Sequence, residues 1–259
     1  MKKLILLIWI YFISTLISTG QEEQLKTVRS IYEAEGKNAV LIAANGKSYK
    51  IDFWEDRAER RKKNVPVFQK TKGSTSRFTG VTRATAKTTN VSRNVYNSFG
   101  SIREVFRKYR LPSDSVMRQR IRSHSPRINT EKKGVILKNA YLFAFKKQRD
   151  NDYHLIVGDH PNITKAFLMT MEITGLPAKP DPLLERARTD FIDAFRLNDD
   201  LSMQAYLVFT DPVPVHVEGP LFFDVTHRAG SVGPRKGKVR FKLRTAWEIH
   251  PITHFSLNE

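Results

Sequence analysis

The chain of 259 residues contains no cysteine, so neither a disulfide bond nor a thiolate nucleophile is available to it. It also has no Gly-rich phosphate-binding loop, no standard zinc-ligand spacing and no serine in a nucleophile motif. Beyond the first twenty residues, no apolar stretch is long enough to span a bilayer. These absences exclude disulfide scaffolds, P-loop enzymes and multi-span membrane proteins.

The N-terminus has the pattern of an export signal. Lys2 and Lys3 precede an uncharged run of 14 residues, Leu4 to Ile17, and the small residues Ser18 and Gly20 suit cleavage before Gln21. We therefore predict that residues 1–20 are a signal peptide and that the protein is exported, to the periplasm or the extracellular medium. After cleavage no transmembrane domain is expected. The alternative is an uncleaved anchor that tethers the chain to a membrane.

The positive charge is concentrated in the middle of the chain. Residues 57–133 hold 21 Lys and Arg against four acidic residues, a net charge of +17 out of the total of +18. Such a segment predicts binding to an anionic polymer, either nucleic acid or an envelope polysaccharide, and Phe106 and Tyr109 could add stacking on bases. The alternative is a solubilising surface without a ligand. The candidate polyanion-binding residues are Arg57, Arg60, Arg61, Lys62, Lys63, Arg103, Arg107, Lys108, Arg110, Arg240, Lys242 and Arg244.

Composition divides the mature chain into three parts. Residues 21–56 predict a helix, at Glu22 to Ala34, and a β-hairpin that turns at Asn45-Gly46. This element is too small to be stable alone, so we expect it to pack on the C-terminal domain or on a partner. Residues 57–133 are predicted to be basic and largely flexible. Residues 134–259 are predicted to form a compact β domain.

The C-terminal part predicts a mainly β fold with one helix. Asp181 is a suitable N-cap for a helix that starts at Pro182, with Leu184, Ala187, Phe191 and Phe195 on one side. The expected strands are Val135–Lys146, Tyr153–Val157, Ala166–Ile173, Met203–Phe209, Val213–Val225 and, at the chain end, Val239–Phe255. Three strands, a helix and two strands are the order of an OB-like small Greek-key barrel. A β-sandwich is the alternative.

Three short motifs carry a family resemblance. They are Asp152-Tyr153-His154-Leu155, then Phe222-Phe223-Asp224 followed by His227, and Glu248-Ile249-His250-Pro251. The chain from about Arg122 to its end thereby resembles a group of uncharacterised exported bacterial proteins with DYHL, FFD-x-x-H and E-(I/L)-H-P motifs. The resemblance implies no particular activity. The basic stretch Arg235–Arg244 departs from the group, in which a shorter Gly/Asn loop stands at this place.

The same motifs provide candidate catalytic residues. In a strand, residues two apart lie on one face, so Asp152 with His154 and Glu248 with His250 form two His–carboxylate pairs. Such groups can transfer protons or hold a divalent metal in phosphodiester hydrolysis. The candidates are His154, His227, Glu248, His250, Asp152 and Asp224; the sequence specifies no cofactor and no metal.

Three functions therefore remain open from the sequence. The leading hypothesis is an exported module that binds an anionic polymer through an OB-like barrel and a basic arm. The alternatives are a His/carboxylate-dependent, metal-assisted or metal-free, phosphodiester hydrolase and a non-catalytic structural protein of the envelope. Convergence of the His–carboxylate pairs at one place would favour the hydrolase.

Overall fold

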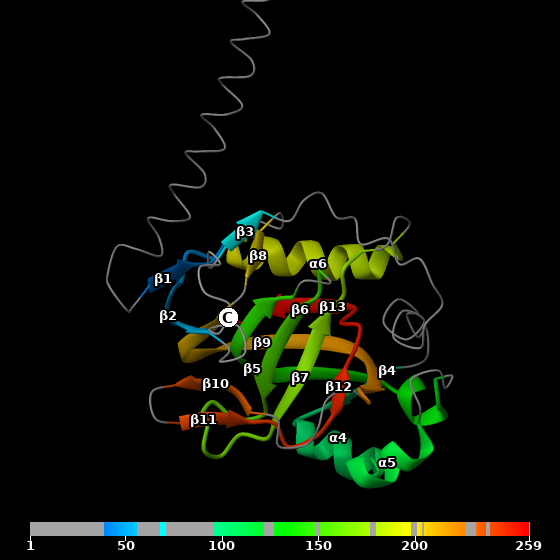
Figure 1. Ribbon diagram of the computed structural model, residues 1–259. Coiled ribbons are helices and arrows are strands. Elements are labelled where there is room, and N and C mark those ends of the chain that lie inside the picture. Colours follow the sequence, from blue (N-terminus) through cyan, green and yellow to red (C-terminus); the bar gives the residue numbers. More distant parts are fainter. Residues whose placement is uncertain are drawn as a thin grey trace, which may run out of the picture.

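The computed structural model describes residues 39–55, 68–70, 96–121, 127–148, 151–176, 180–197, 201–203, 205–225, 232–236 and 239–258. This part of the chain is mainly β, as predicted, and most of its strands belong to one mixed sheet (Figure 1). The predicted signal peptide and the helix predicted at Glu22 to Ala34 lie outside the described residues. A search of the described helices finds none with the length and apolar character needed to cross a membrane.

Five strands pair in a cycle. Strand β5 (Gly134–Lys147) pairs with β6 (Tyr153–Gly158), and β6 pairs with β7 (Leu168–Ile173), both antiparallel. β7 lies parallel to β12 (Trp247–Ile249), which is antiparallel to β9 (Ala205–Phe223). β9 then pairs with β5, so the pairing returns to its first strand.

The long strand β9 corrects one prediction. The sequence suggested two strands, Met203–Phe209 and Val213–Val225, but β9 runs from Ala205 to Phe223 without a break. The residues of β9 between the two predicted strands are accommodated by a register shift in its pairing with β5. Ala144 pairs with Val208, whereas Leu142 pairs with Val213. The length of β9 lets it also pair with β2 (Ser48–Glu55) and β13 (His254–Leu257). The predicted closing strand Val239–Phe255 is divided among β11 (Val239–Lys242), β12 and β13.

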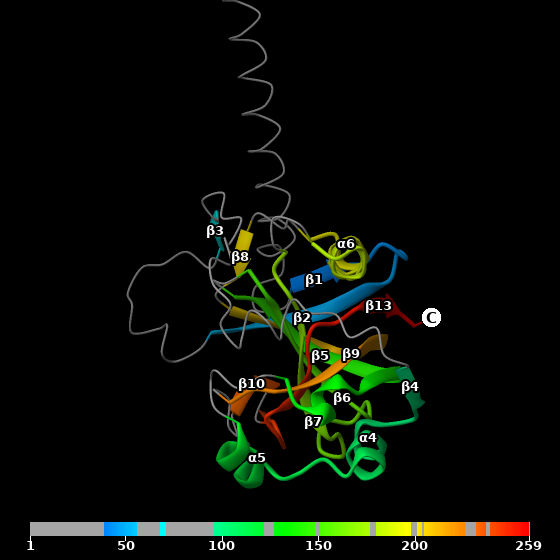
Figure 2. The same ribbon diagram turned by 90° about the vertical axis from the view of Figure 1, so that its right-hand side faces the viewer.

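Helix α6 (Pro182–Phe195) lies where the sequence predicted it. The Asp181 side chain accepts a hydrogen bond from the Leu183 backbone N–H at 2.9 Å and caps the first turn. Phe191 and Phe195 are fully buried and pack on Phe145 and Phe255, with ring centroids 5.0 to 6.2 Å apart. An aromatic cluster under the helix therefore forms one end of the main core, and Figures 1 and 2 show α6 at the opposite end of the molecule from α4 and α5.

The predicted N-terminal hairpin forms from β1 (Ala39–Ile42) and β2. Gly46 in its turn has φ of +79°, the left-handed conformation for which Asn-Gly is favoured. β2 pairs with β9 over Ile51 to Glu55, so the hairpin extends the main sheet. Two further pairs lie off this sheet: β3 (Phe68–Lys70) with β8 (Leu201–Met203), and β10 (Val232–Lys236) with β11.

Residues 96–121 and 127–133 of the basic segment form regular elements. They contain β4 (Tyr96–Phe99), α4 (Ile102–Tyr109), α5 (Asp114–Arg120) and the 3₁₀ helix η1 (Asn129–Lys132). β4 lies parallel to β5, and Ile102, Val105 and Met117 are buried in the main core. The prediction of a largely flexible segment from 57 to 133 is therefore wrong for these residues. The prediction used the average composition of the whole segment, which has few apolar residues, although its two halves differ in composition.

A local signal for α4 was present in the sequence. Ser101 Oγ accepts the Glu104 backbone N–H at 3.1 Å, and Glu104 Oε2 accepts the Gly100 N–H at 2.7 Å. Ser-x-x-Glu is the pattern of a helix N-terminus. The segment is also fixed to the sheet from the other side, since Trp247 Nε1 donates to the Pro112 carbonyl at 2.9 Å.

Gly219 in β9 provides a test of this packing. A Cβ at Gly219 would lie 2.5 Å from Ile249 Cγ2 and 2.5 Å from the Pro251 carbonyl oxygen. We expect Gly219→Ala to lower the free energy of unfolding in urea by roughly 1 to 3 kcal/mol, because backbone on the neighbouring segment must move. Gly100→Ala is the matched control, since its Cβ would meet only the end of the Glu104 side chain, at 3.3 Å, and no backbone. Equal stability of the two variants would contradict the close approach of β9 and β12.

Candidate functional site

The candidate site lies on the outer face of β6, β7 and β12. Along β6 and β7 the side chains of Leu155 and Met171 belong to the main core, whereas those of His154 and Glu172 point the other way. The register places His154 directly opposite Glu172. Because β12 lies beside β7, the residues around Ile249 reach the same place (Figure 1).

Two imidazoles and a second carboxylate meet at Glu172. His154 Nε2 lies 2.8 Å from Glu172 Oε1, and His250 Nδ1 lies 2.7 Å from Glu172 Oε2. His250 Nδ1 is also 3.2 Å from Glu248 Oε1. Asp152 offers a carboxylate oxygen that, together with ligand atoms of Glu172 and His250, forms a group in which all atoms lie within 4.8 Å of one another. We call these five residues, Asp152, His154, Glu172, Glu248 and His250, the Glu172 centre.

Hydrogen-bond partners on neighbouring segments orient Asp152 and His154. Asp152 Oδ1 accepts hydrogen bonds from the Gly175 backbone N–H and, at 3.4 Å, from Thr174 Oγ1, both just beyond β7. Gln148 Nε2 lies 3.3 Å from His154 Nδ1, so both ring nitrogens of His154 have neighbours. These contacts hold the carboxylate and the imidazole in fixed directions.

Backbone contacts fix His250 from both sides. Its N–H donates to the Pro220 carbonyl at 3.0 Å, and its carbonyl accepts from Arg127 Nη2 at 3.0 Å. The Phe222 ring packs edge-on against the imidazole, with centroids 5.4 Å apart. The buried Nε2 of His250 has no hydrogen-bond partner among the described residues. That atom is therefore positioned to bind a ligand or a water molecule.

Burial makes the charges of the centre strongly interdependent. The exposed fraction is at most 9%, for His154, and is 4% for Glu172 and 1% for Glu248. Burial disfavours the charged form of Glu172, but the two imidazoles more than offset this and hold its pKa well below the usual range. Burial and the neighbouring Glu172 carboxylate raise the pKa of Glu248 to about 8. At neutral pH Glu172 is thus ionised and Glu248 is mostly protonated.

The imidazoles complement this pattern. Burial alone would lower the pKa of His250, but Glu172 and Glu248 raise it well above the ordinary value for histidine. The pKa of His154 is likewise raised, because Glu172 outweighs the effect of burial. The Glu172 carboxylate therefore favours the protonated form of both imidazoles, most strongly that of His250.

Four of the six predicted catalytic residues meet in the centre: Asp152, His154, Glu248 and His250. Asp224 lies one residue beyond β9, where its N–H donates to the Ala246 carbonyl at 3.0 Å, and its charge raises the pKa of Glu248. His227 lies outside the described residues. The sequence analysis missed Glu172, although a lone acidic residue in an otherwise apolar strand was a signal for it.

Some of the predicted polyanion-binding residues are exposed, one makes contacts within the fold, and others lie outside the described residues. Arg107, Lys108 and Arg110 are exposed at the end of α4, and Lys242 and Arg244 are exposed near β11. Arg103 is engaged in the fold, since it pairs with Asp159 at 3.0 Å and donates to the Lys165 carbonyl at 2.5 Å. Arg240 lies in β11. Outside the described residues are Arg57, Arg60, Arg61, Lys62 and Lys63.

The aromatic residues near these cations are packed internally. Phe106 lies against Phe167, with centroids 5.1 Å apart, and Tyr109 lies edge-on to Phe99 at 5.2 Å. The Tyr109 hydroxyl donates to the Gly134 carbonyl at 3.0 Å. In this structure these rings fasten α4 to the sheet, and the suggestion that they stack on bases is not supported.

Comparison of the chain with family models, with curated proteins and with solved structures finds no match. Functional inference therefore depends on the geometry of the centre and on the chemistry of its residues.

The pH dependence of stability tests the protonation of the centre. Glu248, His154 and His250 all hold a proton more tightly in the folded protein than at their ordinary pKa values of 4.5 and 6.5. Their contribution is full below those ordinary values and is lost as the pH rises toward the folded pKa values. We expect the free energy of unfolding to fall by roughly 1 to 3 kcal/mol from pH 6 to pH 8.

The variant Glu248→Gln isolates one of these groups. Glutamine imitates the protonated acid but does not titrate, so the variant should lose less stability than the wild type as pH rises to 8. Urea unfolding at several pH values measures the difference. Glu185→Gln, at an exposed site in α6, should keep the wild-type slope. Identical slopes for the wild type and Glu248→Gln would contradict a protonated Glu248.

Proposed function

We propose that the protein is an exported hydrolase of phosphodiester bonds in an anionic polymer and that the Glu172 centre is its active site. One observation carries the proposal: the carboxylates of Glu172 and Glu248 share the imidazole of His250 in a buried setting, where the pKa of Glu172 is held well below its usual range and that of Glu248 is raised to about 8. Carboxylates whose pKa values are pushed apart are the pairs that perform acid–base catalysis at neutral pH.

The geometry suggests separate roles for these groups. Glu172 holds the Nδ1–H of His250, which leaves Nε2 to donate a proton to a phosphoryl or leaving oxygen. Only the ionised fraction of Glu248, which grows as the pH rises toward its pKa of about 8, can take a proton from an attacking water molecule. Glu172 is then the positioning residue for both imidazoles. Because no member is more than 9% exposed, substrate entry requires part of the surrounding surface to move.

The same centre also suits a divalent cation. Asp152, Glu172 and His250 supply two carboxylate oxygens and one imidazole nitrogen that lie within 4.8 Å of one another. Zn²⁺ and Mn²⁺ accept this mixture of ligands and lower the pKa of a bound water molecule. In a metal-assisted hydrolase the residues of the centre would be metal ligands and would not act as proton donors.

We infer further that β5, β6, β7, β9 and β12 form a barrel of the OB type. The cyclic pairing of these strands and the single helix α6 between the third and the fourth support this. OB barrels bind ligands on the face of strands two and three and in the bordering loops. Strands two and three are here β6 and β7, and their outer face carries His154 and Glu172.

The motifs of the resembled group also support the proposal. The first contributes Asp152 and His154, the third contributes Glu248 and His250, and the second places Asp224 where its charge acts on Glu248. We infer that the members of this group share the centre. The export predicted from residues 1–20 would direct such an enzyme to envelope or extracellular polymers.

Activity measurements test the hydrolase. We expect the full chain to hydrolyse bis(p-nitrophenyl) phosphate or RNA, and Glu172→Gln and His250→Ala to lower kcat/KM by about 10²- to 10⁴-fold. Glu185→Gln should leave kcat/KM unchanged, and circular dichroism would verify that each variant is folded. Loss of activity with EDTA and recovery with Zn²⁺ or Mn²⁺ would identify the metal-assisted form. A folded wild type without turnover, with and without added metal, would refute the proposal.

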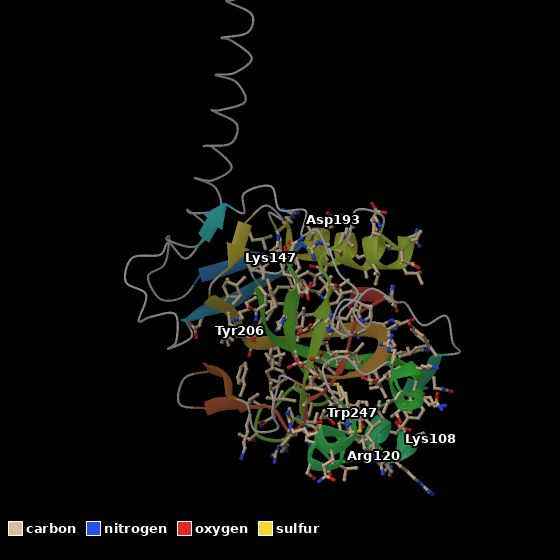
Figure 3. The ribbon with its side chains drawn as sticks, turned by 45° about the vertical axis from the view of Figure 1, so that its right-hand side comes forward. Lys108, Arg120, Lys147, Asp193, Tyr206 and Trp247 are labelled. Carbon is tan, nitrogen blue, oxygen red and sulfur yellow. The ribbon has the colours of Figure 1, made fainter. Side chains whose placement is uncertain are left out.

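A second candidate function is binding of an anionic polymer without chemistry. It is favoured by the exposed cations Arg107, Lys108 and Arg110, which end α4, and Arg120, which ends α5. Figure 3 shows Lys108 and Arg120 at one end of the molecule, away from Asp193 on α6. This basic end could hold the polymer whether or not the centre cleaves it.

Salt-dependent binding tests the basic end. Arg107→Ala with Lys108→Ala should weaken binding to single-stranded DNA or heparin and should reduce the slope of log affinity against log salt by about one to two. The matched control is Lys47→Ala with Lys50→Ala, two exposed cations of the β1–β2 hairpin. An equal effect of the two double variants would assign the binding to overall charge and not to α4.

A further inference from the structure

A second cluster of metal-ligating side chains lies where β13 pairs with β9. His216 and Glu218 are two residues apart on β9, and the intervening Val217 belongs to the main core. His254 on β13 is directly opposite Glu218. The three side chains therefore share the outer face of two neighbouring strands.

The ligand atoms of this cluster are close together. One ligand atom each from His216, Glu218 and His254 can be chosen so that all lie within 4.8 Å of one another. The two imidazole rings are 4.9 Å apart between centroids and are inclined at 68°. The side chains of His216 and Glu218 are 22% and 25% exposed, so the cluster lies near the surface, although His216 Nε2 itself is buried.

His216 and Glu218 also make a close contact on the same strand. His216 Nε2 lies 2.9 Å from Glu218 Oε1, within ion-pair distance. Two of the possible ligand atoms are therefore already adjacent, as they would be in one coordination sphere.

We propose that His216, Glu218 and His254 bind a divalent transition-metal ion, with Zn²⁺ as the best match. Two imidazole nitrogens and one carboxylate oxygen suit Zn²⁺, Co²⁺, Ni²⁺ or Cu²⁺, whereas Mg²⁺ and Ca²⁺ prefer oxygen ligands throughout. Three protein ligands from one surface leave a coordination position open to water.

The ion would join the last strand to the sheet. β13 pairs only with β9 among the described strands, and the ligands come from both. Binding that requires the two strands to be paired stabilises the folded chain in proportion to the logarithm of the free metal concentration. This inference is independent of the Glu172 centre and does not depend on the proposed hydrolase.

Metal titrations of the untagged full chain test the site. We expect Zn²⁺ to raise the melting temperature, and Co²⁺ to give visible absorption bands that Mg²⁺ in excess does not remove. In His254→Ala the affinity that belongs to this site should fall at least tenfold, and the number of bound ions should fall by one per chain. Glu172→Gln should retain the ion at His216, which separates this site from the Glu172 centre.

Two further variants provide controls. Ser256→Ala changes the residue directly opposite His216 without removing a ligand, so it should bind Zn²⁺ like the wild type. Glu218→Gln offers a second test if His254→Ala does not fold, and it should also weaken binding at least tenfold. Equal Zn²⁺ affinity and stoichiometry in the wild type and Glu218→Gln, or equal losses in Ser256→Ala and His254→Ala, would overturn the proposal.

Discussion

The buried carboxylate of Glu172 is the constraint on which the arrangement around it depends. An ionised group with 4% exposure is tolerated only if opposite charges and hydrogen bonds surround it, and His154 and His250 supply both. These partners come from β6 and from the end of β12, on either side of β7. The charge therefore couples the positions of three strands, and loss of either imidazole would remove one of its two partners.

Strand β9 extends this coupling to the rest of the molecule. It pairs with β5, β12, β13 and the N-terminal hairpin, so elements far apart in the sequence align on one strand. Glu248 lies opposite Phe222 on β9, and the His216 cluster begins on the same strand. A continuous strand of 19 residues thus fixes the geometry of both histidine clusters.

Short sequence motifs predicted those parts of the fold that depend on residues close together in the sequence. Asn45-Gly46 marked the hairpin, Asp181 marked the start of α6, and the spacing of Asp152 and His154 placed both at the site. Glu172 could not be assigned in the same way, because its importance arises from cross-strand register with His154. The order of residues 96–121 was missed because the average composition of the basic segment concealed the capped, amphipathic helix α4.

The energetic cost of the Glu172 centre favours a role in proton transfer or metal binding over a purely structural role. Replacing a buried ion pair with well-packed apolar residues is often neutral or stabilising, so stability alone gives no reason for a network of this size. The centre also holds Glu248 protonated beside an ionised Glu172, an arrangement that makes stability sensitive to pH. His250, in turn, presents a buried nitrogen without a partner in the described chain. Costly buried groups with divergent pKa values are what proton transfer or metal binding requires, which is why we place the proposed activity here.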